Sequence, residues 1–516
     1  MRFPRFVIGA ATLMAVAAPT TLPAQIASES LDLDVVAQIR VEGLENSQIE
    51  ALAHYLTDVI GPRLTGSPGM RRANDWTVAK FEEWGLANAA VEPWGEFGRG
   101  WERVRYQGTI LEPFSQPLNA QPVGWTGGTN GRISGPAVVV PGGFDSLASF
   151  TGSLAGAFVM LAEPCWRRQD RRCREIAPEF EHVYRRTPVD SLLQPAVDRP
   201  SRRRGSGPIN WDSLMTRIAD AQARQDADLR AAGVALILTS SSRPNGIIRG
   251  GGKLFGRYGR YDDPLPELVV SQEQYNEMYR DIAEGRSVTL EIDVETQFYD
   301  DDLTSYNSVA DIPGGDLADE YVMIGAHLDS WHYGTGATDN GAGSIVMMEA
   351  MRILKTLGVT PRRTIRIALW SGEEQGLWGS REYLADHPEM HDKISAYLNV
   401  DNGTGKIRGI WNQKNEAASP IFEQTLWPFR DLGVVTVRSG NTGGTDHLSF
   451  DAAGIPGFNF IQDPIEYGIN THHTNLDTFD HMVLEDLMQA AVVVAATAYH
   501  LAMRDEMVPR KAPATP

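Results

Sequence analysis

The chain has 516 residues, of which 42% are hydrophobic and 22% are charged, a balance typical of globular proteins rather than disordered or collagen-like chains. Its 47 basic and 66 acidic residues give a formal net charge of −19, which would repel a phosphate backbone, so we expect no nucleic-acid partner. A chain of this length should fold as two or three domains.

The first 24 residues have the pattern of an export signal. Arg2 and Arg5 form a basic start, an apolar run covers 6–18, and Leu22–Ala24 offers a small-residue cleavage site. Because a bilayer-spanning helix takes ~20 apolar residues, we expect residues 1–24 to be removed as a signal peptide. The mature protein should then be exported, periplasmic or extracellular, with no membrane span; an uncleaved anchor is the alternative.

The next two regions differ in their periodicity. Apolar side chains recur at helical spacing over 49–60, a turn-rich segment follows at 61–69, and an amphipathic helix is predicted from about Met70 to Trp84. From about 106 to 300, short β-like runs alternate with Gly and Pro. The clearest of these runs are 137–140, 157–162, 234–238 and 265–270.

An arginine-rich stretch at 165–204 interrupts this β-rich region, and we interpret it as a solvated loop rather than a binding patch. It contains both cysteines of the chain, Cys165 and Cys173. Since an exported protein meets an oxidising environment, these two can form a disulfide that closes a small loop; two free thiols are the alternative. Two cysteines are too few for a Cys-based metal site.

From about 303 to 505, strand-like and helix-like segments alternate along the chain. One helix is predicted to begin near Gly341, and the last helix is predicted from about Leu484 to Met503. Such alternation indicates an α/β fold with a mostly parallel sheet flanked by helices. The predicted strands are 321–325, 364–369, 396–400, 434–437 and 457–461.

Polar residues follow several of these strands, at the sheet edge where open α/β folds bind ligands. Imidazole and carboxylate groups are zinc ligands, and one carboxylate can bridge two cations ~3.5–4 Å apart. Two zinc ions need about five such side chains, and the sequence supplies enough candidates. They are His327, Asp339, Glu373, Glu374, Asp401, His472 and His473.

Neighbouring glutamates on a loop can point in different directions, so one of Glu373 and Glu374 can bind metal while the other acts as general base. Asp329 and Asp477 are placed to accept the second ring N–H of a ligating histidine. Rival chemistries lack their motifs, because the sequence has no G-x-S-x-G elbow, no H-E-x-x-H and no G-x-x-x-x-G-K-[ST].

These motifs resemble metallopeptidase family 28, the co-catalytic zinc exopeptidases. The likeness rests on HLDSW at 327–331, TDNGAG at 338–343, LWSGEEQG at 369–376 and HHT at 472–474. It extends to IGPRLTGS at 60–67 and is strongest to the plasma glutamate carboxypeptidase branch of the family.

The resemblance implies a role for each candidate. Glu373 would be the general base or acid, and the Asp339–Asn340 peptide would be cis. Of the two adjacent histidines, His473 is taken as the ligand because it directly precedes Thr in the pattern H-T-x-x-D-T. Two zinc ions per chain would be held by His327 and Asp401, by Glu374 and His473, and by a bridging Asp339.

The resemblance also implies the domain organisation and the substrate contacts. The N-terminal part of the peptidase domain would be 31–105, a β-rich protease-associated domain would be inserted at 106–300, and the zinc peptidase domain would be completed by 301–508. His447 and Tyr467 would lie on the substrate side of the pocket.

The implied activity is hydrolysis of dipeptides and short peptides by a zinc exopeptidase of the carboxypeptidase type. Aminopeptidase activity is the first alternative, since the sequence places neither a carboxylate for a free ammonium nor a cation for a terminal carboxylate. Glutaminyl cyclisation and a receptor without zinc are further alternatives. We expect peptides as partners, and we leave open a homodimer and the native metal, because cobalt or manganese also suit N/O donors.

Overall fold

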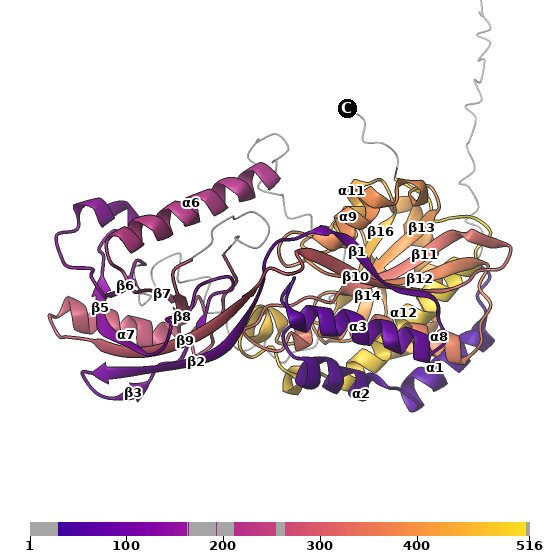
Figure 1. Ribbon diagram of the computed structural model, residues 1–516. Helices are drawn as coiled ribbons and strands as arrows, with labels where there is room; N and C mark the ends of the chain where they lie inside the picture. Colours follow the sequence, from indigo (N-terminus) through magenta and orange to yellow (C-terminus); the bar gives the residue numbers. More distant parts are fainter. Residues whose placement is uncertain (1–28, 163, 165–191, 193–210, 254–263, 512–516) are drawn as a thin grey trace, which may run out of the picture.

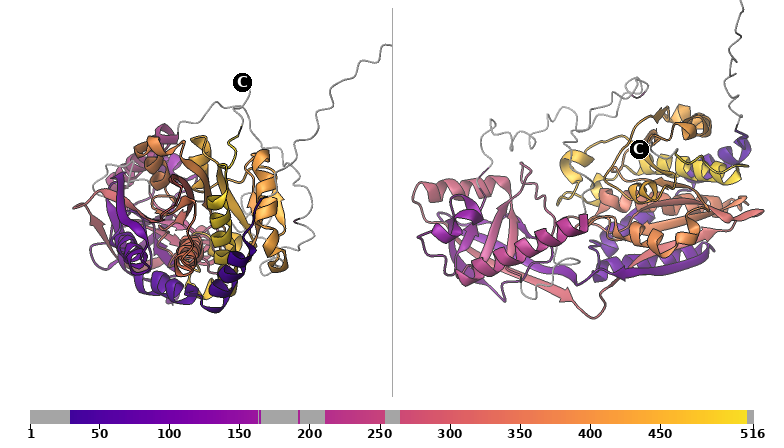
Figure 2. Two further views of the ribbon diagram at one scale, coloured as in Figure 1. Left: turned by 90° about the vertical axis from the view of Figure 1, so that its right-hand side faces the viewer. Right: turned by 90° about the horizontal axis from the view of Figure 1, so that it is seen from above.

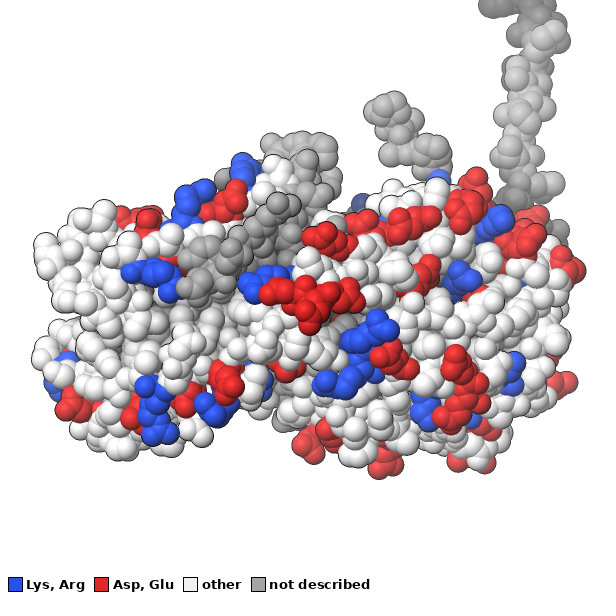
Figure 3. Space-filling view, in the orientation of Figure 1, with Lys and Arg blue, Asp and Glu red and all other residues white. Residues whose placement is uncertain are grey.

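The computed structural model describes residues 29–511 apart from 163, 165–191, 193–210 and 254–263. These residues form two lobes that lie side by side, each built on an eight-stranded sheet (Figures 1 and 2). The predicted signal peptide, Cys165, Cys173 and nearly all of the arginine-rich stretch lie outside the described residues. On the face drawn in Figure 3, acidic and basic side chains are interspersed over both lobes.

The sheet of the first lobe has the strand order β1-β10-β12-β11-β13-β16-β14-β15. The run β12-β11-β13-β16 is parallel, whereas β1 and β10 add an antiparallel edge. This mostly parallel core confirms the predicted α/β fold, although β1, β10 and β14 were not predicted. The strands are β1 (Ala87–Glu96), β10 (Thr304–Ile312), β11 (Leu317–His327), β12 (Arg363–Trp370), β13 (Ile394–Asn399), β14 (Ile407–Trp411), β15 (Thr436–Arg438) and β16 (Gly457–Gln462).

Helices cover both faces of this sheet because successive strand residues point to opposite sides (Figure 1). Val322 and Ile324 of β11 belong to one apolar core, and Met323 between them belongs to another. The first core is shared with α1 (Leu33–Glu45), α2 (Ile49–His54), α3 (Pro68–Glu83), α8 (Ala342–Thr356) and α12 (Leu484–Met503). The second is shared with α9 (Trp378–Asp386) and α11 (His447–Ala452), while α10 (Ser419–Thr425) precedes β15.

The last helix, α12, begins and ends where the sequence predicts. It is long and apolar enough to cross a membrane by composition, but 89% of its apolar window is buried within the fold. Its alanine and valine side chains pack against α8 and β11. In this structure α12 is therefore a core helix of the first lobe.

The chain leaves the first sheet after β1, builds the second lobe and returns with β10. The second sheet has the order β3-β2-β9-β5-β6-β7-β8-β4, and residue 106, the expected start of the insert, falls inside β2. Two helices, α6 (Trp211–Ala231) and α7 (Gln272–Ala283), were not predicted. The strands are β2 (Gly100–Glu112), β3 (Gln116–Pro117), β4 (Ala120–Pro122), β5 (Ile133–Val139), β6 (Phe158–Met160), β7 (Leu236–Ser240), β8 (Glu267–Val270) and β9 (Thr289–Tyr299).

Candidate metal centre

The candidate ligands meet at the carboxyl edge of the parallel strands. His327 is the last residue of β11, and loops that follow β12, β13 and β16 supply the others. Asp339 lies in the turn Ala337–Gly341 that leads into α8, and its peptide bond to Asn340 is cis. Because neighbouring parallel strands end at one edge, residues far apart in the chain converge there. The converging ligand candidates are His327, Asp339, Glu374, Asp401 and His473.

One group of donors surrounds His327, which is 1% exposed. Its Nε2 lies 3.4 Å from Oδ1 of Asp339 and 3.5 Å from Oδ1 of Asp401. The donor atoms of these three residues all lie within 4.8 Å of one another. One imidazole and two carboxylates at this spacing can hold one divalent cation.

A second group surrounds His473. Its Nε2 lies 2.9 Å from Oε2 of Glu374 and 3.3 Å from Oδ2 of Asp339. The Nε2 of His472 is farther from the same Asp339 oxygen, at 3.9 Å. His473 has φ +61°, a left-handed conformation that is uncommon outside glycine. Asp339 therefore presents one oxygen to each group, as a bridging carboxylate must.

The charge of this cluster suits cations. Among the described residues, no hydrogen-bond donor satisfies the buried oxygens Asp339 Oδ2, Glu374 Oε1 and Asp401 Oδ1. Burial lowers the pKa of His327, but the charges of Asp401 and Glu373 raise it well above the ordinary value. This shift reflects the surplus of negative charge around the imidazole. A bound metal would supply compensating positive charge, so these residues fit a metal centre.

Glu373 lies beside the metal-ligand candidates and is 9% exposed. Its Oε2 is 3.9 Å from Nε2 of His327. Burial and the nearby carboxylates of Asp401 and Asp446 raise the pKa of Glu373 well above the ordinary glutamate value. A carboxyl group with a raised pKa can both accept and donate a proton near neutral pH, as a general base and acid must.

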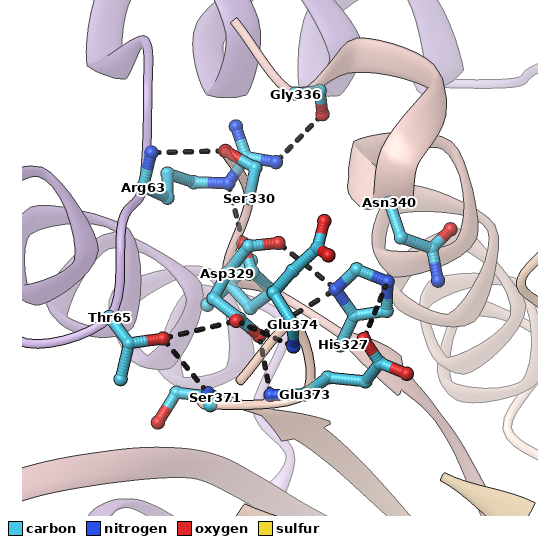
Figure 4. A network of polar contacts seen from close by, with 12 residues as sticks. Arg63, Thr65, His327, Asp329, Ser330, Gly336, Asn340, Ser371, Glu373 and Glu374 are labelled. Carbon is cyan, nitrogen blue, oxygen red and sulfur yellow. Dashed lines mark hydrogen bonds and ion pairs between the residues drawn. The ribbon is translucent and has the colours of Figure 1, made fainter. Parts of the chain in front are cut away.

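Asp329 positions the two glutamates (Figure 4). Its Oδ1 accepts the backbone N–H of Glu373 and its Oδ2 accepts that of Glu374, each at 3.3 Å, while Thr65 donates its hydroxyl to Oδ2 at 3.0 Å. The Nδ1–H of His327 meets the backbone carbonyl of Asp329 at 3.0 Å, closer than the carboxylate at 3.6 Å. The contact with a histidine ring that was expected of the Asp329 side chain is therefore made mainly by the backbone carbonyl of Asp329.

Asp477 differs from its expected role. Its Oδ1 accepts the backbone N–H of Thr338 at 2.6 Å instead of a histidine ring N–H. Burial and the charge of Asp339 raise the pKa of Asp477 to about 7. Because Thr338 directly precedes Asp339, Asp477 fixes the segment that carries the shared carboxylate.

The two expected substrate-side residues lie in different environments. The ring of Tyr467 is 5.1 Å from that of His472, and burial together with the charge of Asp339 raises the pKa of its hydroxyl. His447 is fully buried at the start of α11, where Nε2 lies 3.3 Å from the carbonyl of Thr442. Burial lowers the pKa of His447 to about 4. The structure therefore brings Tyr467 to the centre and leaves His447 as a neutral packed residue.

Several further residues reach the site without having been assigned a role from sequence. Trp331 donates its indole N–H to Oε2 of Glu374 at 2.7 Å, and it stands within the HLDSW motif. The carboxylate of Asp446 is fully buried, and burial raises its pKa to about 7. Arg249 comes from the second lobe and donates to the carbonyl of His472 at 3.4 Å. Of these three, only Trp331 lies within a motif that the sequence analysis names.

Arg63 fixes the backbone on either side of the ligands (Figure 4). Its fully buried guanidinium donates to the carbonyls of Leu328 at 2.6 Å, Gly336 at 2.7 Å, Thr335 at 2.8 Å and Gly61 at 3.1 Å. Burial lowers the pKa of Arg63 to about 10, so it remains charged at neutral pH. One side chain thus joins the end of β11 to the turn before α8.

We expect Arg63→Met to destabilise the first lobe. Four carbonyl groups would lose a buried donor, each at a cost of about 1–3 kcal/mol, so the melting temperature should fall by several degrees. Differential scanning fluorimetry of the metal-loaded protein measures this. Arg71→Met is the matched control, since that side chain is 49% exposed. Equal melting temperatures for the two variants would show that Arg63 is not a structural clamp.

Comparisons with known proteins agree on one relationship. Residues 307–498 match peptidase family M28. The chain is 28% identical over 474 residues to carboxypeptidase Q of Mus musculus, covering 90% of this chain and 88% of that protein. It is 30% identical over 201 residues to aminopeptidase YwaD of Bacillus subtilis (strain 168), covering 37% of this chain and 43% of that protein.

Among solved structures, a peptidase M28 precursor from Shewanella amazonensis aligns with a TM-score of 0.67 and 25% sequence identity. The alignment covers 93% of this chain and 98% of that chain. Because the coverage is nearly complete, the likeness includes both lobes rather than the metal centre alone.

Proposed function

We propose that this chain is an exported zinc exopeptidase with two metal ions, because residues 307–498 match peptidase family M28. Its substrates would be dipeptides and short peptides. One observation carries the proposal: Asp339 presents one oxygen to the His327 group and the other to the His473 group. Likeness to carboxypeptidase Q over 90% of the chain favours carboxypeptidase action over aminopeptidase action.

The chain's own donors indicate how the metals would be held. His327 and Asp401 would bind one zinc ion, Glu374 and His473 the other, and Asp339 would bind both. The mixed imidazole and carboxylate set is one that zinc favours. When bound, the two ions would polarise the scissile carbonyl and lower the pKa of the attacking water.

Glu373 would move the proton during hydrolysis. Its carboxylate takes a proton from the attacking water and then delivers it to the nitrogen of the leaving amine. Asp329 holds the backbone of Glu373, which keeps the carboxylate aimed at the same place for both transfers. Tyr467, whose ring lies 5.1 Å from that of His472, would donate its hydroxyl to the carbonyl oxygen of the substrate.

The direction of attack can be tested with one short peptide in three forms: free, N-acetylated and C-amidated. We expect the zinc-loaded protein to release the C-terminal residue from the free peptide and to hydrolyse the amidated one far more slowly. Mass spectrometry identifies the products. Cleavage of the free and amidated forms only would indicate an aminopeptidase, and N-terminal cyclisation of a Gln peptide would indicate a cyclase. Absence of any reaction would contradict the proposed hydrolase.

A further inference from the structure

A loop of the second lobe lies directly on the segment that carries the two adjacent histidines. Arg249 forms an antiparallel β-bridge with Thr474. On one side of the bridge, Ile248 donates its backbone N–H to Asn475 Oδ1 at 2.7 Å and accepts the backbone N–H of Asn475 at 3.0 Å. These backbone contacts fix Arg249 next to His473, one of the two histidines of the metal centre.

The guanidinium of Arg249 reaches the same histidines. Its Nε–H points to the carbonyl of His472 at 3.4 Å, a long contact that uses one of five donors. Burial lowers the pKa of His472 and of His473, and the positive charge of Arg249 lowers both further. Within the described parts of the chain, no carboxylate forms an ion pair with Arg249, so its charge faces the centre uncompensated there.

A second arginine of the same lobe lies close by. Arg243 donates to the carbonyl of Gly468 at 2.7 Å, in the turn that begins with Tyr467. Burial lowers the pKa of Arg243, and the charge of Arg249 lowers it further. Its buried Nε has no hydrogen-bond partner among the described residues. Both arginines thus donate to the segment 468–472, where they bring two positive charges that can attract an anion in a chain of net charge −19.

We propose that Arg249, supported by Arg243, binds the free C-terminal carboxylate of the peptide substrate. The proposal rests on the proposed peptidase function and names its substrate class, peptides whose last residue is the leaving group. In such a residue the scissile nitrogen and the carboxylate are separated by one Cα. The carboxylate therefore lies within about one residue length, ~3.8 Å, of the reacting bond, and the cation that binds it lies one hydrogen bond, about 2.9 Å, beyond. The backbone bridge with Thr474 puts Arg249 beside His473, a metal-ligand candidate.

This assignment gives the two lobes different roles. The first lobe supplies the candidate metal ligands and Glu373, whereas the second lobe supplies the arginine that binds the C-terminal carboxylate of the substrate. Arginine suits that role because its planar fork can bind both carboxylate oxygens at once. An aminopeptidase would instead need a carboxylate beyond the metals to bind a free ammonium.

The test uses the zinc-loaded full chain with a panel of free dipeptides and the C-terminal amide of the best substrate. Arg249→Gln should lower kcat/KM for the free dipeptide by about 10- to 100-fold, mainly through KM, and change hydrolysis of the amide by less than about threefold. Arg249→Lys should lose less, and Arg243→Gln should lose activity in the same direction. Arg132→Gln is the matched control, being a 59% exposed arginine of the same lobe.

Three results would overturn the proposal, and each would have a different meaning. If wild type cleaves the amide as well as the free dipeptide, the protein is a peptidase that does not recognise the C-terminal carboxylate. If Arg249→Gln lowers both rates equally while zinc content and melting temperature stay unchanged, Arg249 has another role. If wild type cleaves no dipeptide of the panel, the proposed function itself fails and the inference fails with it.

Discussion

Glu373→Gln should leave the zinc content unchanged and lower kcat by about 10³-fold, within the 10²–10⁴-fold range of general acid–base catalysis. Glutamine has nearly the same shape as glutamate, so the backbone contact with Asp329 and the burial should persist. What disappears is the group that accepts the proton of the attacking water. The effect should fall on kcat rather than KM, because Glu373 is not assigned to hold the substrate in its ground state.

The measurement pairs steady-state kinetics with elemental analysis of zinc. Glu50→Gln is the matched control, because Glu50 is an exposed residue of α2. A Glu373→Gln variant with both metals and near-normal kcat would rule out Glu373 as the proton carrier. Loss of zinc in that variant would show that Glu373, rather than Glu374 alone, helps to hold the metals.

The sequence predicts a site residue best where the local hydrophobic pattern fixes which strand the residue ends or follows. His327 ends a strand of the parallel sheet, and Glu373, Glu374 and Asp401 come within four residues after other strands, so hydrophobic periodicity and the carboxyl-edge rule together predict that they converge. The structure brings Glu373 and Asp401 within 4 Å of His327. The roles of these residues as ligands and base stay predictions until metal and turnover are measured.

Contacts between distant segments could not be predicted in the same way. Arg249 meets His472 across 223 residues, and no periodicity relates a loop in one lobe to a turn in the other. Asp477 was assigned from its place after the histidines, but folding turns it toward Thr338. The antiparallel strand β10 also depends on long-range pairing, with β1 and β12 on its two sides.

One missed element did have a local signal. The helix α7 carries Tyr275, Met278 and Ile282 at spacings of three and four residues, and all three contribute to the core of the second lobe. The surrounding sequence alternates short strands with Gly and Pro, which favours strands throughout the region. A β-rich composition therefore hid a helix whose own periodicity is clear.

Asp339→Asn should be the most damaging single change to metal binding. Among the residues that the structure describes, Asp339 alone contacts both histidine groups, with Oδ1 3.4 Å from His327 and Oδ2 3.3 Å from His473. An amide is neutral and offers only one oxygen, so it cannot bridge two cations. We expect the zinc content to fall to about one ion per chain or fewer and kcat/KM to fall by more than about 10²-fold. Mutating residues that only hydrogen-bond to metal ligands typically lowers metal affinity or activity by at most about 10²-fold, so a larger loss is expected for a ligand itself.

Asp401→Asn is the variant to compare, because in the described part of the chain the ion pairs of Asp401 are with His327 and not with His473. The comparison tests whether Asp339 is shared by the two metals. Asp401→Asn should weaken one metal and leave the other, whereas Asp339→Asn should weaken both. Melting temperature gives an independent readout, because ligands that bind only the folded state stabilise it by about 4 kcal/mol at 1,000 times their Kd. A chelator should therefore lower the melting temperature of wild type clearly and that of Asp339→Asn little. Equal zinc content and an equal response to the chelator in the two variants would show that Asp339 is not the shared ligand. The two donor groups would then have to bind their metals independently.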